Sequence, residues 1–167
     1  MSRRVGILLS DEDHVLAAVE SLVVLVARRP ATPEHVKRID AELRALARTY
    51  PEGVGYLHVV DSRKNESRRV SDETRHAFVE LARNAPPEAR CVGIALLADG
   101  FVAAAMRGVV AAAVAAFRAR IPIKVFGSIA DTCAWIEETY RAAGVRIAPA
   151  ADLARAVEDV RARVHGE

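Results

Sequence analysis

The stretch CVGIALLAD (91–99) decides the fold class. A strand with one face in water alternates apolar and polar side chains, whereas this run is apolar at almost every position. Apolar residues on both faces are typical of a central strand in a parallel sheet that helices cover on each side. The stretch therefore predicts an α/β protein.

Outward from this strand, short apolar runs alternate with segments of helical spacing. Further strands are predicted at 5–10, 21–27, 54–61 and 121–128. Helices are predicted at 33–50, 72–85, 101–119 and 129–143. The segment DEDHVLAAVE (11–20) fits either a hairpin arm or a helical turn. Strands that alternate with helices predict right-handed crossovers and a mainly parallel sheet.

Capping residues mark where these helices begin and end. Thr32 is predicted as the N-cap of the first helix, with Pro33 at its first helical position. Ser71 is predicted to cap the second helix, and Gly144 to end the helix 129–143.

The last residues form an extension with a helix of its own. In PAADLARAVEDVRARVHGE (149–167), four apolar residues fall on one helical face: Leu153, Val157, Val160 and Val164. We expect a single α/β domain over residues 1–143, a mainly parallel sheet flanked by helices, and a C-terminal extension (144–167) that carries this amphipathic helix.

The composition is typical of a soluble globular protein. The chain has 167 residues, of which 51% are hydrophobic and 28% are charged. Its formal net charge of +2 produces no strong field toward nucleic acid, and 5% aromatic residues are few for stacking on bases. We therefore expect no nucleic-acid partner.

The cysteines and the start of the chain indicate a cytoplasmic protein. Cys91 and Cys133 stand in apolar surroundings and form no CxxC pair, which predicts reduced thiols in the core. The first apolar run is short and is followed by acidic residues, unlike a signal peptide.

The helix GFVAAAMRGVVAAAVAAF (100–117) consists mostly of small apolar residues. Arg107 lies near its middle, where an arginine costs roughly 2.5–3.5 kcal/mol in a bilayer, so we expect no membrane span. Small residues at intervals of four allow another backbone to come close: Ala104, Gly108, Ala112 and Ala116. This row is open to two interpretations, packing within the subunit or a homodimer face.

Two stretches resemble the SpoIIAA-like STAS family, named for sulfate transporters and anti-sigma-factor antagonists. IPIKVFGSIADTCAWIEETY (121–140) is similar to the last strand and following helix of that family, with matches at Phe126, Ala130, Ala134, Trp135 and Ile136. LVVLVARRPATPEHVKRI (22–39) is similar to a strand followed by a helix that starts at threonine. The resemblance covers roughly residues 20–143. It implies a mixed sheet flanked by helices, usually no catalysis, and a role as a regulatory switch, a partner-binding module or a binder of apolar ligands.

The regulatory members of that family are phosphorylated on a serine in an Asp-Ser-Ser-Gly-like turn after a central strand. Here Asp61 and Ser62 follow the strand 54–61, but Arg63 comes next and no glycine follows. The resemblance makes Ser62 a phosphosite candidate, in a turn that departs from the family pattern.

The sequence shows no motif for catalysis or for metal binding. Its five histidines have neither HExxH nor His-x-His spacing: His14, His35, His58, His76 and His165. No serine stands in a Gly-x-Ser-x-Gly elbow, and GFVAAAMRG (100–108) lacks the three glycines of a dinucleotide-binding turn. We expect no catalytic residue, no metal and no cofactor.

The loop 62–75 carries the clearest charge pattern. Five cationic residues are candidates for binding an anion or an acidic partner: Arg63, Lys64, Arg68, Arg69 and Arg75. They precede or begin a helix, whose N-terminal N–H groups favour anions. Acidic residues in the same region can neutralise them. RRVS (68–71) resembles a kinase target, which makes Ser71 a second phosphosite candidate besides its role as a plain N-cap.

These patterns favour a non-enzymatic, cytosolic protein-interaction or signalling module of STAS-like type. The alternative is a protein that binds a small apolar or phosphorylated ligand between sheet and helices. A large empty pocket would favour the ligand-binding protein, and a flat interface with small residues would favour the interaction module.

Overall fold

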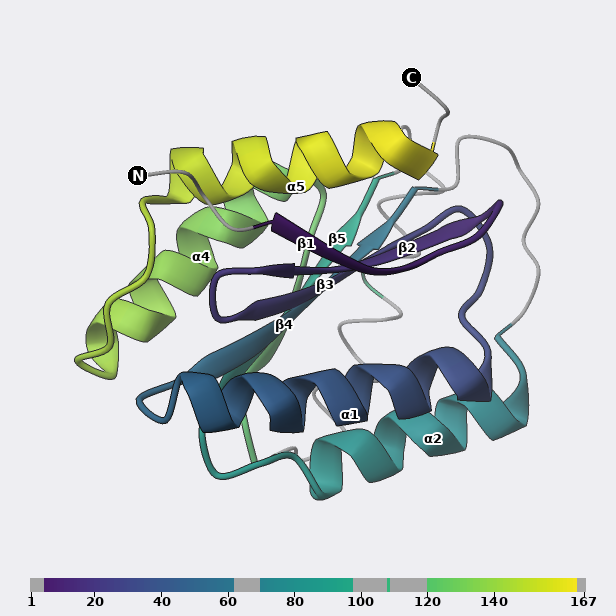
Figure 1. Cartoon of the computed structure of the whole chain (residues 1–167), viewed down its shortest axis with the longest axis horizontal. Helices are drawn as coiled ribbons and strands as arrows, with labels where there is room; N and C mark the ends of the chain where they lie inside the picture. Colours follow the sequence, from purple (N-terminus) through teal and green to yellow (C-terminus); the bar gives the residue numbers. More distant parts are fainter. Residues whose placement is uncertain (1–4, 62–69, 98–107, 109–119, 165–167) are drawn as a thin grey trace.

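The computed structural model describes residues 5–61, 70–97, 108 and 120–164. There, a six-stranded sheet lies between two layers of helices, with α1 and α2 on one face and α4 and α5 on the other (Figure 1). The strands are β1 (Val5–Ser10), β2 (His14–Val19), β3 (Leu22–Ala27), β4 (Val54–Val60), β5 (Ala89–Leu96) and β6 (Ile123–Phe126). The helices are α1 (Pro33–Thr49), α2 (Asp72–Arg83), α4 (Ile129–Ala142) and α5 (Ala150–Val164). This arrangement confirms the predicted α/β class.

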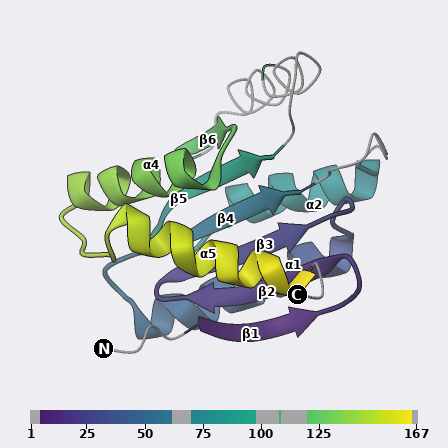
Figure 2. The ribbon, with the colours of Figure 1, turned by 90° about the horizontal axis from the view of Figure 1, so that it is seen from above.

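The strands lie in the sheet in chain order, from β1 at one edge to β6 at the other (Figure 2). The pairs β1–β2 and β2–β3 are antiparallel, whereas the three pairs from β3 to β6 are parallel. The sheet is therefore mixed and mainly parallel. The segment 11–20, which fitted either a hairpin arm or a helical turn, contains β2 and is a hairpin arm.

The central strand β3 contributes to a core on each face of the sheet. All of its residues are buried. Val24 and Val26 join the core beneath α4 and α5, while Val23 and Leu25 join the core beneath α1 and α2. Full burial of each such side chain contributes roughly 1.5–3 kcal/mol. The uninterrupted apolar run is explained by helices on both faces.

The helix starts follow the predicted caps. Thr32 precedes α1, and its Oγ1 accepts the His35 N–H at 3.4 Å. Ser71 precedes α2, and its Oγ accepts the Thr74 N–H at 3.1 Å. Gly144 follows α4 with φ +72°, a conformation that glycine adopts without strain.

The C-terminal helix α5 is part of the core. Its four predicted face residues are 0–6% exposed: Leu153, Val157, Val160 and Val164. They belong to the same buried cluster as Val15 and Ala17 of β2. In Figure 2, α5 lies across the β2–β3 side of the sheet. The amphipathic stripe of the extension thus covers the antiparallel part of the sheet.

The strand that decided the fold class is β5, between β4 and β6. Its Gly93 permits the close approach of α4, because a Cβ built there would lie 2.6 Å from Cγ2 of Thr132 and 3.2 Å from Cδ1 of Ile136. Both of those side chains are fully buried. A side chain at position 93 therefore has no space without a shift of α4.

We expect Gly93→Ala to destabilise the protein by about 2 kcal/mol, because the added methyl group overpacks the β5–α4 contact. Gly6→Ala in β1 is the matched control, since a Cβ there meets nothing within 4 Å. Urea denaturation of both variants measures the difference. Equal midpoints for the two variants would contradict the placement of α4.

The two cysteines are buried free thiols, as predicted. Burial raises the pKa of Cys91 to about 12. Burial, together with the charge of Glu158, raises the pKa of Cys133 to about 12. Both thiols are therefore protonated at neutral pH and are poor nucleophiles.

The small-residue row lies largely outside the described residues. Only Gly108 is described, and it is exposed, so the two interpretations of Ala104, Gly108, Ala112 and Ala116 stay predictions. No helix in the described part of the chain is long and apolar enough to cross a membrane.

Candidate functional site

The candidate site lies where the parallel strands β3 and β4 end and where β2 begins. Asp11 comes from the turn between β1 and β2, His14 is the first residue of β2, and His35 comes from the first turn of α1. One carboxylate oxygen and one imidazole nitrogen from each histidine lie within 4.8 Å of one another. We call these three residues the Asp11–His14–His35 cluster.

Asp11 is held by the turn that it starts. Its Oδ1 accepts the backbone N–H groups of Asp13 at 2.9 Å and of His14 at 2.8 Å. Burial raises the pKa of the Asp11 carboxyl, but the Asp13 N–H bond and the His14 ring lower it more, so the net pKa lies below its usual value. The carboxylate is therefore ionised at neutral pH, and the turn bonds involve only its Oδ1.

His14 is bound at both ring nitrogens. Its Nδ1 lies 3.1 Å from Oδ1 of Asp11, and its Nε2 lies 3.1 Å from the carbonyl oxygen of Arg29. A carboxylate and a carbonyl only accept hydrogen bonds, so each of these contacts needs a proton on the ring nitrogen concerned, and the tautomer of the ring decides which nitrogen donates. The side chain is 8% exposed and its ring stacks on that of His35, with centroids 4.1 Å apart.

His35 connects the cluster to the start of α1. Its Nε2 lies 3.3 Å from Oδ2 of Asp11. Its Nδ1 accepts the Thr32 backbone N–H at 3.1 Å and lies 3.0 Å from Thr32 Oγ1. These bonds complete a capping box in which histidine occupies the position usual for Glu or Gln.

His58 of β4 lies on the same face of the sheet, without a hydrogen bond to the cluster. Its ring packs between those of Tyr56 at 5.9 Å and Phe78 at 5.8 Å. Burial lowers the pKa of His58 to about 4, and the nearby His14 and His35 add to this shift. His58 is therefore neutral at pH 7, half-buried between β4 and α2.

On the opposite face, the residue that follows β4 forms a buried ion pair with α5. Oδ2 of Asp61 accepts a hydrogen bond from Nε of Arg161 at 2.6 Å, and the Asp61 side chain is 1% exposed. Arg161 also donates to Glu158 at 3.0 Å. The hydrogen bond to Asp61 raises the pKa of Arg161, against the effect of burial. The ion pair links the carboxyl end of β4 to the C-terminal helix α5.

The predicted cationic loop lies mostly outside the described residues. This applies to Ser62, Arg63, Lys64, Arg68 and Arg69. Arg75 is described and is paired with Asp72 in the first turn of α2. Ser71 is the N-cap of that helix and also donates to Thr74 Oγ1 at 2.9 Å. Anion binding and phosphorylation in this loop stay predictions.

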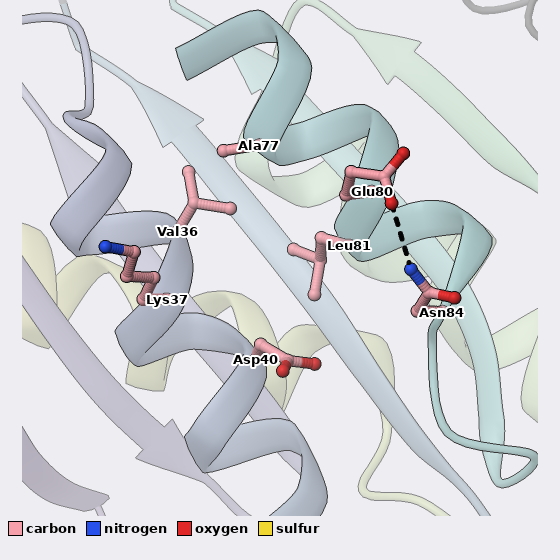
Figure 3. A pocket seen from close by; sticks show the side chains of 7 residues that line it. All are labelled: Val36, Lys37, Asp40, Ala77, Glu80, Leu81 and Asn84. Carbon is pink, nitrogen blue, oxygen red and sulfur yellow. Dashed lines mark hydrogen bonds between the residues drawn. The ribbon is translucent and has the colours of Figure 1, made fainter. Parts of the chain in front are cut away.

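Two hollows open on the surface near α1. The first lies between α1 and α2, has a volume of about 220 Å³, and is lined by Val36, Lys37, Asp40, Ala77, Glu80, Leu81 and Asn84 (Figure 3). The second, of about 420 Å³, is lined by Arg44, Ala47, Arg48, Pro51, Pro86, Pro87 and Glu88. Pockets for small molecules are typically enclosed clefts of about 300–1,000 Å³. The first hollow is below this range, and the second is a more open depression with charged walls.

Motif spacing does not reveal the Asp11–His14–His35 cluster, because its residues lie on two separate segments. Each segment nevertheless carries a local signal: Asp11 and His14 are three residues apart, as are Thr32 and His35. If 11–20 is taken as a hairpin arm, both segments meet at the carboxyl edge of β3. The expectation of no metal rests on motif spacing within single segments and stays a prediction.

Comparison of the chain with protein-family models, with curated proteins and with solved structures finds no match. The resemblance to STAS proteins therefore stays a prediction from the stretches 22–39 and 121–140. In the structure these stretches form β3 with the start of α1, and β6 with most of α4.

Proposed function

We propose that the protein is a non-enzymatic, STAS-like interaction module of the cytoplasm, which associates with a second copy of itself along the outer edge of β1. The observation that carries this proposal is the exposed apolar edge of the sheet. In the described residues, β1 pairs with β2 and with no other strand. The N–H and C=O groups on the outer side of an edge strand can pair with another chain.

The sequence of β1 leaves this edge weakly protected. VGILLS carries neither a charge nor a proline, the residues that most often prevent edge-to-edge pairing. Ile7 is 39% exposed, one of two large apolar residues so exposed among those described. A register shift between Ile7 and Leu9 is the one feature of the described strand that interrupts regular pairing.

A second copy is the occupant that best fits this edge. Two antiparallel copies of VGILLS place apolar side chains opposite apolar side chains and bring no like charges together. A two-fold interface requires such self-complementarity. The pairing would join two sheets into one and would cover Ile7.

We expect the wild-type protein to sediment as a dimer at micromolar concentration and Ile7→Lys to sediment as a monomer. A lysine at this position places a charge on the edge of each copy and should leave the fold intact, which circular dichroism checks. Val70→Lys is the matched control, because Val70 is 40% exposed but lies on the loop before α2. A wild-type monomer at about 100 µM, or a dimer of Ile7→Lys, would refute the proposal and would indicate that the bulge suffices to block the edge.

The alternative of a small-ligand protein has less support from the described residues. The hollow between α1 and α2 has an apolar floor of Val36, Ala77 and Leu81, but it is small and open (Figure 3). We therefore propose self-association through β1 in preference to the binding of a small ligand.

A further inference from the structure

We propose that the Asp11–His14–His35 cluster binds a divalent transition-metal ion of the zinc type. The ion would be held by Oδ2 of Asp11, Nδ1 of His14 and Nε2 of His35. This inference does not depend on the proposed self-association, because it concerns the turn after β1 and the start of α1.

The spacing of the ligand atoms fits such an ion. Zn²⁺ lies about 2.0–2.1 Å from nitrogen and carboxylate ligands, so two ligands in tetrahedral geometry are about 3.3 Å apart. Oδ2 of Asp11 and Nε2 of His35 are already 3.3 Å apart, and Nδ1 of His14 lies 3.1 Å from the other carboxylate oxygen of Asp11, Oδ1. The ligand atoms all lie within 4.8 Å of one another, so closure around an ion needs a movement of at most about 1.5 Å.

His14 and Asp11 have the supporting contacts that metal ligands usually have. The Nε2–H group of His14 donates to the Arg29 carbonyl, which leaves Nδ1 for the ion when the ring is neutral. The Oδ1 atom of Asp11 is held by two backbone N–H groups, which leaves Oδ2 for the ion. Binding therefore replaces the imidazole N–H···O contacts and keeps the bonds that orient the ligands.

His35 can present Nε2 to an ion because Thr32 satisfies either tautomer of its ring. In the structure, Nδ1 accepts the Thr32 N–H. A metal at Nε2 requires the proton on Nδ1, where Thr32 Oγ1 lies 3.0 Å away and can accept it. Thr32 itself is exposed, so water can accept its released N–H.

The ligand set selects the class of metal. Two imidazoles and one carboxylate suit zinc and its neighbours, whereas Mg²⁺ and Ca²⁺ prefer oxygen ligands alone. The Asp11 side chain is 46% exposed, which gives an ion access from solvent, while the histidines are 8% and 13% exposed. Three protein ligands leave a position for water. The ion would join the β1–β2 turn to α1.

The test uses the full-length protein after treatment with EDTA and exchange into metal-free buffer. We expect calorimetry to detect one Zn²⁺ per chain, and Co²⁺ to produce the visible absorption of a four-coordinate site. His35→Gln removes a ligand but keeps the capping box, because glutamine is a usual residue at that position. Asp11→Asn removes the anionic ligand. We expect each variant to weaken Zn²⁺ binding by at least about 100-fold.

His76→Gln is the matched control, since His76 is an exposed histidine of α2 outside the cluster. It should bind Zn²⁺ as the wild type does. Circular dichroism establishes that all variants are folded. No Zn²⁺ uptake by the wild type would overturn the proposal, as would equal affinity of the wild type, His35→Gln and Asp11→Asn.

Discussion

Arg161→Met is expected to lower the free energy of unfolding by about 3 kcal/mol. Arg161 donates to Asp61 at 2.6 Å, and the Asp61 side chain is 1% exposed. Removal of one partner from a buried pair withdraws the charge that compensates the desolvation of the other. Methionine keeps most of the aliphatic length of arginine, so the variant tests the charge more than the packing. Urea denaturation at pH 7 measures the effect.

Arg155→Met is the matched control on the same helix. Arg155 pairs with Asp152 at 3.6 Å, but its side chain is 65% exposed. Exposed pairs contribute roughly 0–1 kcal/mol, so this variant should resemble the wild type. If Arg161→Met were as stable as Arg155→Met, Arg161 would not be needed to compensate the desolvation of Asp61, and this ion pair would not hold α5 at the end of β4.

The strands and helices could be predicted because local patterns dictate them. An apolar, β-branched run such as 22–27 favours a buried strand. Thr32 and Ser71 accept hydrogen bonds from N–H groups that the start of any helix leaves without a partner in the helix. The segment 11–20 stayed open because Asp11, Glu12 and Asp13 interrupt its apolar pattern. In the structure these acids form the turn before β2, where Asp11 accepts backbone N–H groups.

The candidate site could not be predicted in the same way, because it depends on sheet topology. Asp11 and His35 are 24 residues apart and meet only when β2 and α1 are placed at the same edge of the sheet. The Asp61–Arg161 pair spans 100 residues. The apolar stripe of α5 predicts which face is buried, but it does not predict which strand end lies beside Arg161.

His58 is expected to make the protein less stable in acid. In the unfolded chain a histidine takes up a proton near pH 6.5, whereas burial lowers the pKa of folded His58 to about 4. Between these values the unfolded chain binds more protons, so stability falls as the pH falls. At pH 7 the protonation of His58 lowers the free energy of unfolding only slightly. Between pH 7 and pH 4.5 it lowers that free energy by about 2–3 kcal/mol.

His58→Leu removes the titrating group and keeps an apolar side chain between Tyr56 and Phe78. The change in unfolding free energy from pH 7 to pH 4.5 should therefore be about 2–3 kcal/mol smaller in the variant than in the wild type. All other ionisable groups are the same in both proteins, so the difference between the two pH profiles isolates His58. EDTA in the buffer removes any metal from the Asp11–His14–His35 cluster. Parallel pH profiles would mean that water reaches His58 in the folded protein and that α2 does not cover it.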